Sequence, residues 1–177
     1  NKKIKLHLVL AASTVLERYG NTHLTVENDG FKIDEKLYII IESETLLSSA
    51  KSTGLGIIEF AGAFKRINPD LVLVMADRFE VISAAIAATY QNIPLAHVQG
   101  GEVSGNIDEK VRHAITKLAD IHFPSTKRAK QWLIKMGENP EKVFHTGCPS
   151  IDLVKKVIKN PESKINIYKK YGGVGSK

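Results

Sequence analysis

Short apolar runs alternate with amphipathic helical patterns over the second half of this 177-residue chain, and this alternation constrains the fold more than any other feature. The apolar runs predict strands, and the segments between them repeat apolar residues at helical spacing. Such a series predicts a parallel sheet with helices on both faces, a Rossmann-like α/β fold. The predicted strands are residues 71–75, 93–98, 120–125 and 142–147, and the predicted helices are residues 80–92, 107–119, 127–137 and 149–159.

The earlier part of the chain adds fewer elements. Residues 4–11 and 37–41 are apolar and predict two further strands, and a helical pattern follows from Thr45 to Arg66. The polar stretch 17–30 is too irregular to support a prediction. Because the run at 71–75 is continuously apolar, we expect that strand to be covered on both faces.

Composition narrows the class of protein. A hydrophobic fraction of 43% is ordinary for a globular core, and a chain of this length suits one domain. No apolar run approaches the roughly 20 residues that a membrane-spanning helix needs. The single cysteine, Cys148, excludes a disulfide framework and favours a reducing compartment. We therefore expect a cytoplasmic protein without a membrane partner.

The net charge of +6 does not indicate a nucleic-acid partner. Residues 151–177 hold seven lysines and two acidic residues, which accounts for +5, and the rest of the chain is nearly balanced. Aromatic residues are not interleaved with basic ones, as a base-stacking surface requires. We expect residues 1–160 to form the Rossmann-like domain and residues 161–177 to be a lysine-rich tail or the start of a linker.

Polar residues and glycines follow three of the predicted strands where each strand ends. In an open parallel sheet, ligands bind outside the carboxyl ends of the strands, so we expect these residues to gather around one site. They are Asp77 and Arg78 after the first of these strands, Gln99, Gly100, Gly101 and Glu102 after the second, and Gly147 and Asp152 after the third. The helix at 107–119 adds Asp108, Glu109, Arg112 and His113 near its start.

Each of these residues also has a purely structural interpretation. Asp77 could cap the following helix, and Gly100 and Gly101 could form a tight turn. The polar residues of 107–119 lie opposite the apolar stripe, which is typical of an exposed helix surface. The set is more informative than its members, because carboxylates in different environments hold different pKa values and supply both a proton acceptor and a proton donor.

The sequence offers little sign of a metal site. No spacing of cysteine and histidine resembles a zinc site. Asp77, Glu102 and Asp108 could hold a divalent cation, but nothing in the sequence requires one. An arginine beside these acids offers a forked donor that suits phosphate. His97 lies inside a predicted strand and fits a core histidine with satisfied hydrogen bonds.

Several motifs together resemble the UDP-N-acetylglucosamine 2-epimerase family, and most closely its hydrolysing branch, which forms N-acetylmannosamine. They are ADRFE at 76–80, the long segment 97–126, TGCPSID at 146–152, YGNT at 19–22 and DGFKID at 29–34. The resemblance implies a GT-B enzyme, in which two Rossmann-like domains enclose the substrate. Residues 1–160 would be its N-terminal catalytic domain without the first strand. Most uridine diphosphate contacts would belong to a second domain outside this sequence.

The resemblance also implies a reaction without a metal or nicotinamide cofactor. A base removes the C2 proton of UDP-N-acetylglucosamine while UDP leaves C1, and water then adds at C1 of the glycal as C2 is reprotonated from the other face. Asp77 matches a catalytic acid or base of the family. Gln99 stands where many relatives have a catalytic glutamate, so either Glu102 or Asp108 would be the second proton-transfer group.

The remaining candidate residues are expected to bind the substrate. They are Arg78, Gly100, Gly101, Glu109, Arg112, His113, Gly147 and Asp152. Two other functions stay open on the sequence alone: a non-hydrolysing epimerase, and a fragment that binds a nucleotide sugar without catalysis. The resemblance also implies a homodimer or a higher homo-oligomer.

Overall fold

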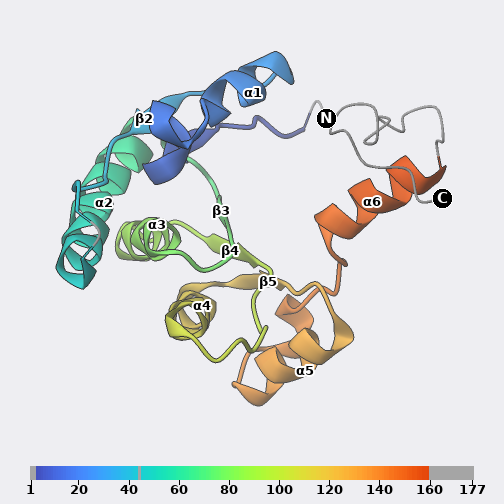
Figure 1. The fold of residues 1–177 in the computed structure, drawn as a ribbon. Coiled ribbons are helices and arrows are strands. Elements are labelled where there is room, and N and C mark those ends of the chain that lie inside the picture. The colour runs from blue at the N-terminus through green and yellow to red at the C-terminus, as the bar shows by residue number, and fades with distance from the viewer. Residues whose placement is uncertain (1–2, 44, 160–177) are drawn as a thin grey trace, which may run out of the picture.

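The computed structural model describes residues 3–43 and 45–159, which form parallel strands with helices packed around them (Figure 1). The strands are β1 (Val9–Ala11), β2 (Glu35–Leu37), β3 (Val72–Met75), β4 (Leu95–Val98) and β5 (Ile121–Phe123). Every strand pair is parallel. The predicted Rossmann-like α/β class is confirmed.

The helices follow the predicted order. They are α1 (Thr22–Asn28), α2 (Leu46–Ile67), α3 (Phe79–Tyr90), α4 (Ile107–Leu118), α5 (Lys127–Lys135) and α6 (Pro149–Lys159). All except α1 were predicted to within a few residues, and α1 lies in the polar stretch that supported no prediction. None of the helices in the described part of the chain is both long and apolar enough to cross a membrane.

The strands belong to two sheets. β1 pairs with β2, and β3, β4 and β5 pair in that order, with Val72 opposite Leu95 and Ala96 opposite Ile121. Among the described residues, no ladder joins β1 to β3. The strand predicted at 4–11 is longer than β1, and the strand predicted at 37–41 is misplaced, because it shares only Leu37 with β2. The ladder between β1 and β2 joins residues 9–11 to residues 35–37.

The core lies on one face of the three-stranded sheet. Val72 and Val74 of β3 are buried, whereas Leu73 is 58% exposed and Met75 is 47% exposed. The prediction that β3 is covered on both faces is therefore wrong. Figure 1 shows the reason: α3 and α4 pack on one side of the sheet, and α6 lies on the other side without closing over it.

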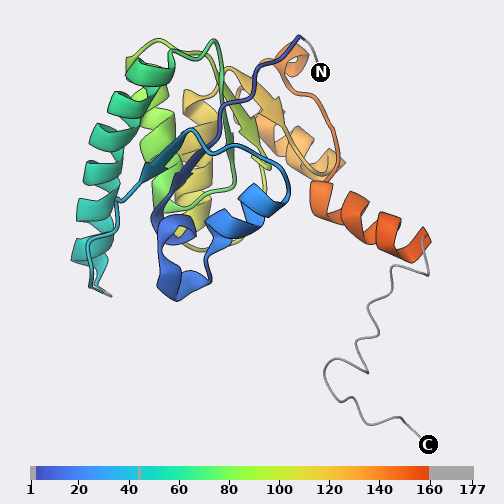
Figure 2. The same cartoon turned by 90° about the horizontal axis from the view of Figure 1, so that it is seen from above.

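The strand predicted at 142–147 is also wrong. Only a single parallel bridge forms there, between Val143 and His122. A 3-10 turn at Pro140–Lys142 precedes this bridge, and next to β5 the Phe144 N–H donates to the His122 carbonyl at 2.8 Å. Figure 2 shows α6 leading away from the sheet after this segment. The expected tail at 161–177 lies outside the described residues.

Candidate active site

The first part of the site is the turn that follows β3. The Ala76 N–H donates to the Val98 carbonyl at 3.3 Å, which continues the pairing of β3 with β4. Ala76 then adopts a left-handed conformation with a φ of 68°, which is strained for a residue with a Cβ. Asp77 follows this turn with its side chain 17% exposed. It does not cap α3, whose N-cap residue is Arg78.

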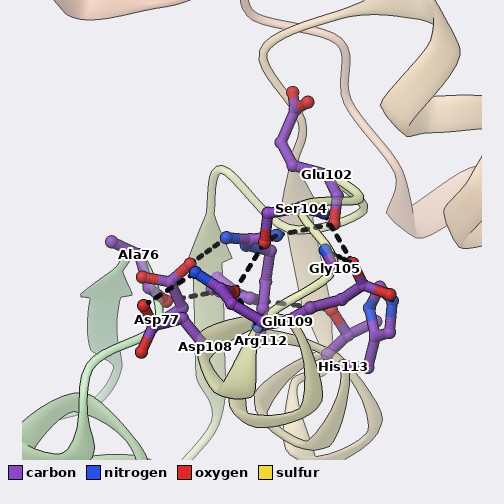
Figure 3. A network of polar contacts seen from close by, with 12 residues as sticks. Ala76, Asp77, Glu102, Ser104, Gly105, Asp108, Glu109, Arg112 and His113 are labelled. Carbon is purple, nitrogen blue, oxygen red and sulfur yellow. Dashed lines mark hydrogen bonds and ion pairs between the residues drawn. The ribbon is translucent and has the colours of Figure 1, made fainter.

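Arg112 joins this turn to α4 and to the loop before α4. Its Nη2 forms an ion pair with the Asp77 carboxylate, and its Nη1 donates to the Glu102 carbonyl at 2.7 Å and to the Ser104 hydroxyl at 3.3 Å (Figure 3). The Arg112 side chain is only 10% exposed. The prediction of an exposed polar helix face is therefore wrong for this residue, because α4 packs close enough to the end of β3 for the guanidinium to find partners inside the protein.

Glu109 holds the loop that precedes α4. Its Oε2 accepts hydrogen bonds from the backbone N–H groups of Ser104 and Gly105, each at 2.5 Å. These two donors hold the pKa of the Glu109 carboxyl below its usual value. Asn106 caps α4 by accepting from the Glu109 N–H at 3.2 Å. With these contacts, Glu109 stabilises the loop, a role that the sequence did not indicate.

The two candidates for a second acid or base differ in orientation. Figure 3 shows the Asp77 and Asp108 carboxylates on the same side of Arg112, whereas the Glu102 carboxylate points away from both. Asp108 accepts from the Asn106 amide at 3.3 Å, and the Ser104 hydroxyl donates to that same side-chain amide at 2.9 Å. Arg112 also reaches Ser104, so a chain of polar contacts connects Asp77 with Asp108.

Gly100 and Gly101 lie against the protein itself. A Cβ on Gly100 would come within 2.9 Å of His97 Nδ1 and 3.1 Å of Thr116 Oγ1. Gly101 has a φ of +82°, and its Cβ would lie 2.5 Å from the Ala129 carbonyl oxygen of α5. Both positions thus need glycine for packing, apart from any contact with a ligand.

Gln99 connects the end of β4 to the start of α6. Its side-chain amide donates to Cys148 Sγ at 3.7 Å, and its backbone has a φ of 65°. Backbone N–H groups of Ile151 and Ser150 at the start of α6 lower the pKa of the Cys148 thiol. The residue after β4 and the residues before α6 are therefore brought together, as the sequence predicted.

An open groove of about 590 Å³ lies beside this contact. Its floor is apolar and includes the exposed β3 side chains Leu73 and Met75. Gly147 and Asp152 line it together with Lys156 of α6. Asp77, Asp108 and Arg112 do not line this groove, so these two predicted residues lie apart from the Asp77–Arg112 contact.

Glu80 is a candidate that sequence reasoning missed. It lies in the first turn of α3, three residues after Asp77, within the ADRFE motif. Its Oε2 is buried without a hydrogen-bond partner, and Arg78 approaches its Oε1 at 3.3 Å. Burial raises the pKa of the Glu80 carboxyl, and the nearby Asp108 raises it further. The motif contained this residue, but only the tertiary structure reveals its burial.

His113 completes the polar edge of α4. Its Nε2 lies 3.7 Å from Glu109 Oε1, and its Nδ1 is buried without a partner. Within residues 3–43 and 45–159, no group of three or more histidine, cysteine or acidic side chains is arranged to hold a metal ion.

Comparison with known proteins identifies the family. A family model described as UDP-N-acetylglucosamine 2-epimerase matches residues 1–174. A UDP-N,N'-diacetylbacillosamine 2-epimerase (hydrolyzing) from Legionella pneumophila is 43% identical over 134 residues, covering 76% of this chain and 36% of that protein. A GDP/UDP-N,N'-diacetylbacillosamine 2-epimerase (hydrolyzing) from Campylobacter jejuni is 33% identical over 158 residues, covering 89% and 41%.

A solved structure supports the same relationship. A UDP-N-acetylglucosamine 2-epimerase crystal structure superimposes with a TM-score of 0.79 at 26% identity, covering 94% of this chain and 44% of that one. This chain therefore spans less than half the length of the relatives that it matches. On the family model and the sequence identities together, the chain belongs to the UDP-N-acetylglucosamine 2-epimerase family.

Proposed function

We propose that the protein carrying this chain is a hydrolysing 2-epimerase, which converts UDP-N-acetylglucosamine and water into N-acetylmannosamine and UDP. The observation that carries this proposal is the carboxylate of Asp77, held by Arg112 at the carboxyl end of β3, where ligands of parallel sheets bind. Two relatives with 43% and 33% identity have "hydrolyzing" in their names, which supports this branch of the family.

The reaction has two steps. In the first, a base takes the proton from C2, the electrons of the C2–H bond form a C1–C2 double bond, and the C1–O bond breaks as UDP leaves. In the second, water adds at C1 and loses a proton to a base, while an acid delivers a proton to the other face of C2. The first step needs a group that accepts a proton, and the second needs one group that accepts a proton from water and another that supplies a proton to C2.

We assign Asp77 as one proton-transfer group and Asp108 as the other. Their carboxylates lie on the same side of Arg112 and are linked through Ser104 and Asn106. Glu102 is less suited, because its carboxylate points away from both. Gln99 carries an amide, which cannot exchange a proton as a carboxyl group does, and it contacts Cys148.

The remaining assignments concern binding. Arg78 carries an exposed guanidinium suited to a phosphate oxygen, and His113 lies beside Glu109 on the polar edge of α4. Gly147 and Asp152 line the groove beside the carboxyl ends of β3 and β4, and we assign them to substrate binding there. We propose that residues 1–160 are the N-terminal catalytic domain and that further uridine diphosphate contacts come from outside this sequence.

A second substrate is favoured by the names of the two relatives, which refer to UDP-N,N'-diacetylbacillosamine. This sugar keeps the 2-acetamido group and the C2 proton that the mechanism needs. We propose the same chemistry for it.

We also propose that the protein is cytoplasmic and forms a homo-oligomer. Light scattering of the purified protein measures its oligomeric state.

The decisive test is product analysis in ¹⁸O-labelled deuterated water, with the longest gene product that contains this chain. We expect free 2-acetamido sugar with ¹⁸O at C1 and deuterium at C2, together with UDP. A product that retains UDP would identify a non-hydrolysing epimerase. Calorimetric binding of UDP-sugar without any isotope incorporation would instead identify a binding module and overturn the proposal.

A further inference from the structure

His97 is a buried histidine in β4 whose two ring nitrogens both have partners. The residue has 0% exposure. Its Nε2 lies 3.1 Å from the carbonyl oxygen of Ala76, and its Nδ1 lies 3.3 Å from the hydroxyl of Thr116 in α4. The ring thus spans the space between the end of β3 and the middle of α4, directly beneath the turn that presents Asp77.

The partners determine where the ring carries its proton. A carbonyl oxygen can only accept, so Nε2 must carry a hydrogen and donate it to Ala76. Nδ1 is then an acceptor, and the Thr116 hydroxyl donates to it. Burial lowers the pKa of His97 to about 4, so the ring is neutral at physiological pH. The Ala76 carbonyl therefore selects the tautomer with its proton on Nε2, and the Thr116 hydroxyl satisfies Nδ1 in that tautomer.

Ala76 is the residue whose conformation directs Asp77. Its φ of 68° is strained for alanine, so the surrounding contacts must hold it. Its N–H is fixed by Val98 and its carbonyl by His97. Because the Ala76 carbonyl belongs to the peptide plane that leads into Asp77, a bond to this oxygen fixes the orientation of the following Cα.

We propose that His97 is a positioning residue for Asp77. It holds the left-handed turn at Ala76 from below, while Arg112 holds the Asp77 carboxylate from the side of α4. Gly100 belongs to the same device, since a side chain there would enter the space of the His97 ring and Thr116. This inference rests on the proposed role of Asp77 in proton transfer.

Two substitutions of His97 separate its two hydrogen bonds. In His97→Gln, the side-chain nitrogen is as many bonds from Cα as Nε2, so the donor to Ala76 is kept. In His97→Asn, the nitrogen corresponds to Nδ1, so the contact with Thr116 remains possible and the bond to Ala76 is lost. We expect H97Q to keep kcat within about threefold, and H97N to lose on the order of 100-fold in kcat with KM little changed.

Two substitutions of Thr116 test the same role if the H97N variant does not fold. Thr116→Val keeps the shape and removes the hydroxyl, which leaves the buried Nδ1 without its hydrogen-bond partner and the ring less firmly held against Ala76. Thr116→Ser keeps the hydroxyl. We expect T116V to lower kcat by about tenfold or more and T116S to behave like the parent protein.

The measurements use the longest gene product that contains this chain, with kinetics of sugar release and a crystal structure of each variant. In H97N the φ of Ala76 should leave the left-handed region, and in H97Q it should stay there. Equal kcat losses in H97N and H97Q, or normal kcat in both H97N and T116V, would overturn the positioning role. If the parent protein releases no sugar, the proposed function fails, and the Ala76 conformation in the variant crystals still tests His97.

Discussion

Arg112 and Asp77 form a shielded ion pair although 35 residues separate them in the chain. The pair connects the turn after β3 to α4. The other terminal nitrogen of Arg112, Nη1, donates to the Glu102 carbonyl in the loop before α4. Because both side chains are largely removed from water, the loss of one partner leaves the other charge buried without compensation.

Arg112→Ala should therefore destabilise the protein strongly. We expect the free energy of unfolding to fall by about 3 kcal/mol, because the Asp77 carboxylate would stay shielded without its partner. Urea denaturation measures the change. Arg66→Ala is the matched control: its ion pair with Glu35 has a 57% exposed guanidinium, so its loss should lower the free energy of unfolding much less. Similar losses in both variants would contradict the prediction.

Asp77→Asn should abolish turnover in a protein that still folds, although the loss of the negative charge beside Arg112 should lower its stability. Asparagine keeps the size of the side chain and can still accept a hydrogen bond from Arg112, but it cannot accept the C2 proton. We expect kcat to fall by at least about 100-fold. Asp70→Asn, at an exposed position before β3, should leave kcat unchanged. Near-normal sugar release by D77N, measured by mass spectrometry, would remove Asp77 from the mechanism.

The buried His97 should make stability depend on pH. Its folded-state pKa is about 4, below the ordinary value of 6.5, so the unfolded chain binds more protons between these values. The contribution of His97 to the free energy of unfolding is therefore fully present above pH 6.5 and is lost as the pH falls through about 4. The total loss is about 3 kcal/mol. The difference between the urea midpoints at pH 7 and pH 4.5 should be smaller in H97Q than in the parent protein. An unchanged pH dependence in H97Q would contradict this.

Glu80 should make stability depend on pH in the opposite direction from His97. Its raised pKa means that the folded state binds the proton more tightly than the unfolded chain does. Its contribution is favourable at low pH and is lost as the pH rises through the folded-state pKa. Glu80→Gln, which stays neutral, should therefore raise the melting temperature at pH 8 more than at pH 4. The exposed Glu141→Gln should show no such difference, and an equal response in both variants would argue against burial as the cause.

Replacing a glycine by alanine should change stability in opposite directions at Gly101 and Gly54, because their surroundings differ. Gly101→Ala should cost more than about 2 kcal/mol, because the new Cβ meets the Ala129 carbonyl at 2.5 Å in a left-handed conformation. Gly54→Ala should stabilise the protein by up to about 1 kcal/mol, because it lies inside α2 with no atom within 4 Å of a Cβ. Thermal unfolding of both variants measures the two effects. A stable G101A would show that α5 can move aside.

Much of the site was predictable from the sequence because parallel strands end at one edge. The predicted gathering of residues from three strand ends is seen in part: Arg112 contacts Asp77 and the Glu102 carbonyl, whereas Gly147 and Asp152 lie apart along the groove. The catalytic and binding roles of these residues stay predictions. Glu80 and His97 were missed as site residues, since nothing local distinguishes a buried titratable side chain from an exposed one.

The sequence alone determined the alternation of strands and helices from β3 to α5, the parallel arrangement and the family, since hydrophobic periodicity and the long motif depend on neighbouring residues. Only the tertiary structure decided that the strands divide into two sheets, that Arg112 is buried, that Glu102 points away from Asp77, and that Gly100 makes room for His97. The physical reason is that these features depend on contacts between elements far apart in the chain, and the partner of a buried polar group is set by which elements pack together.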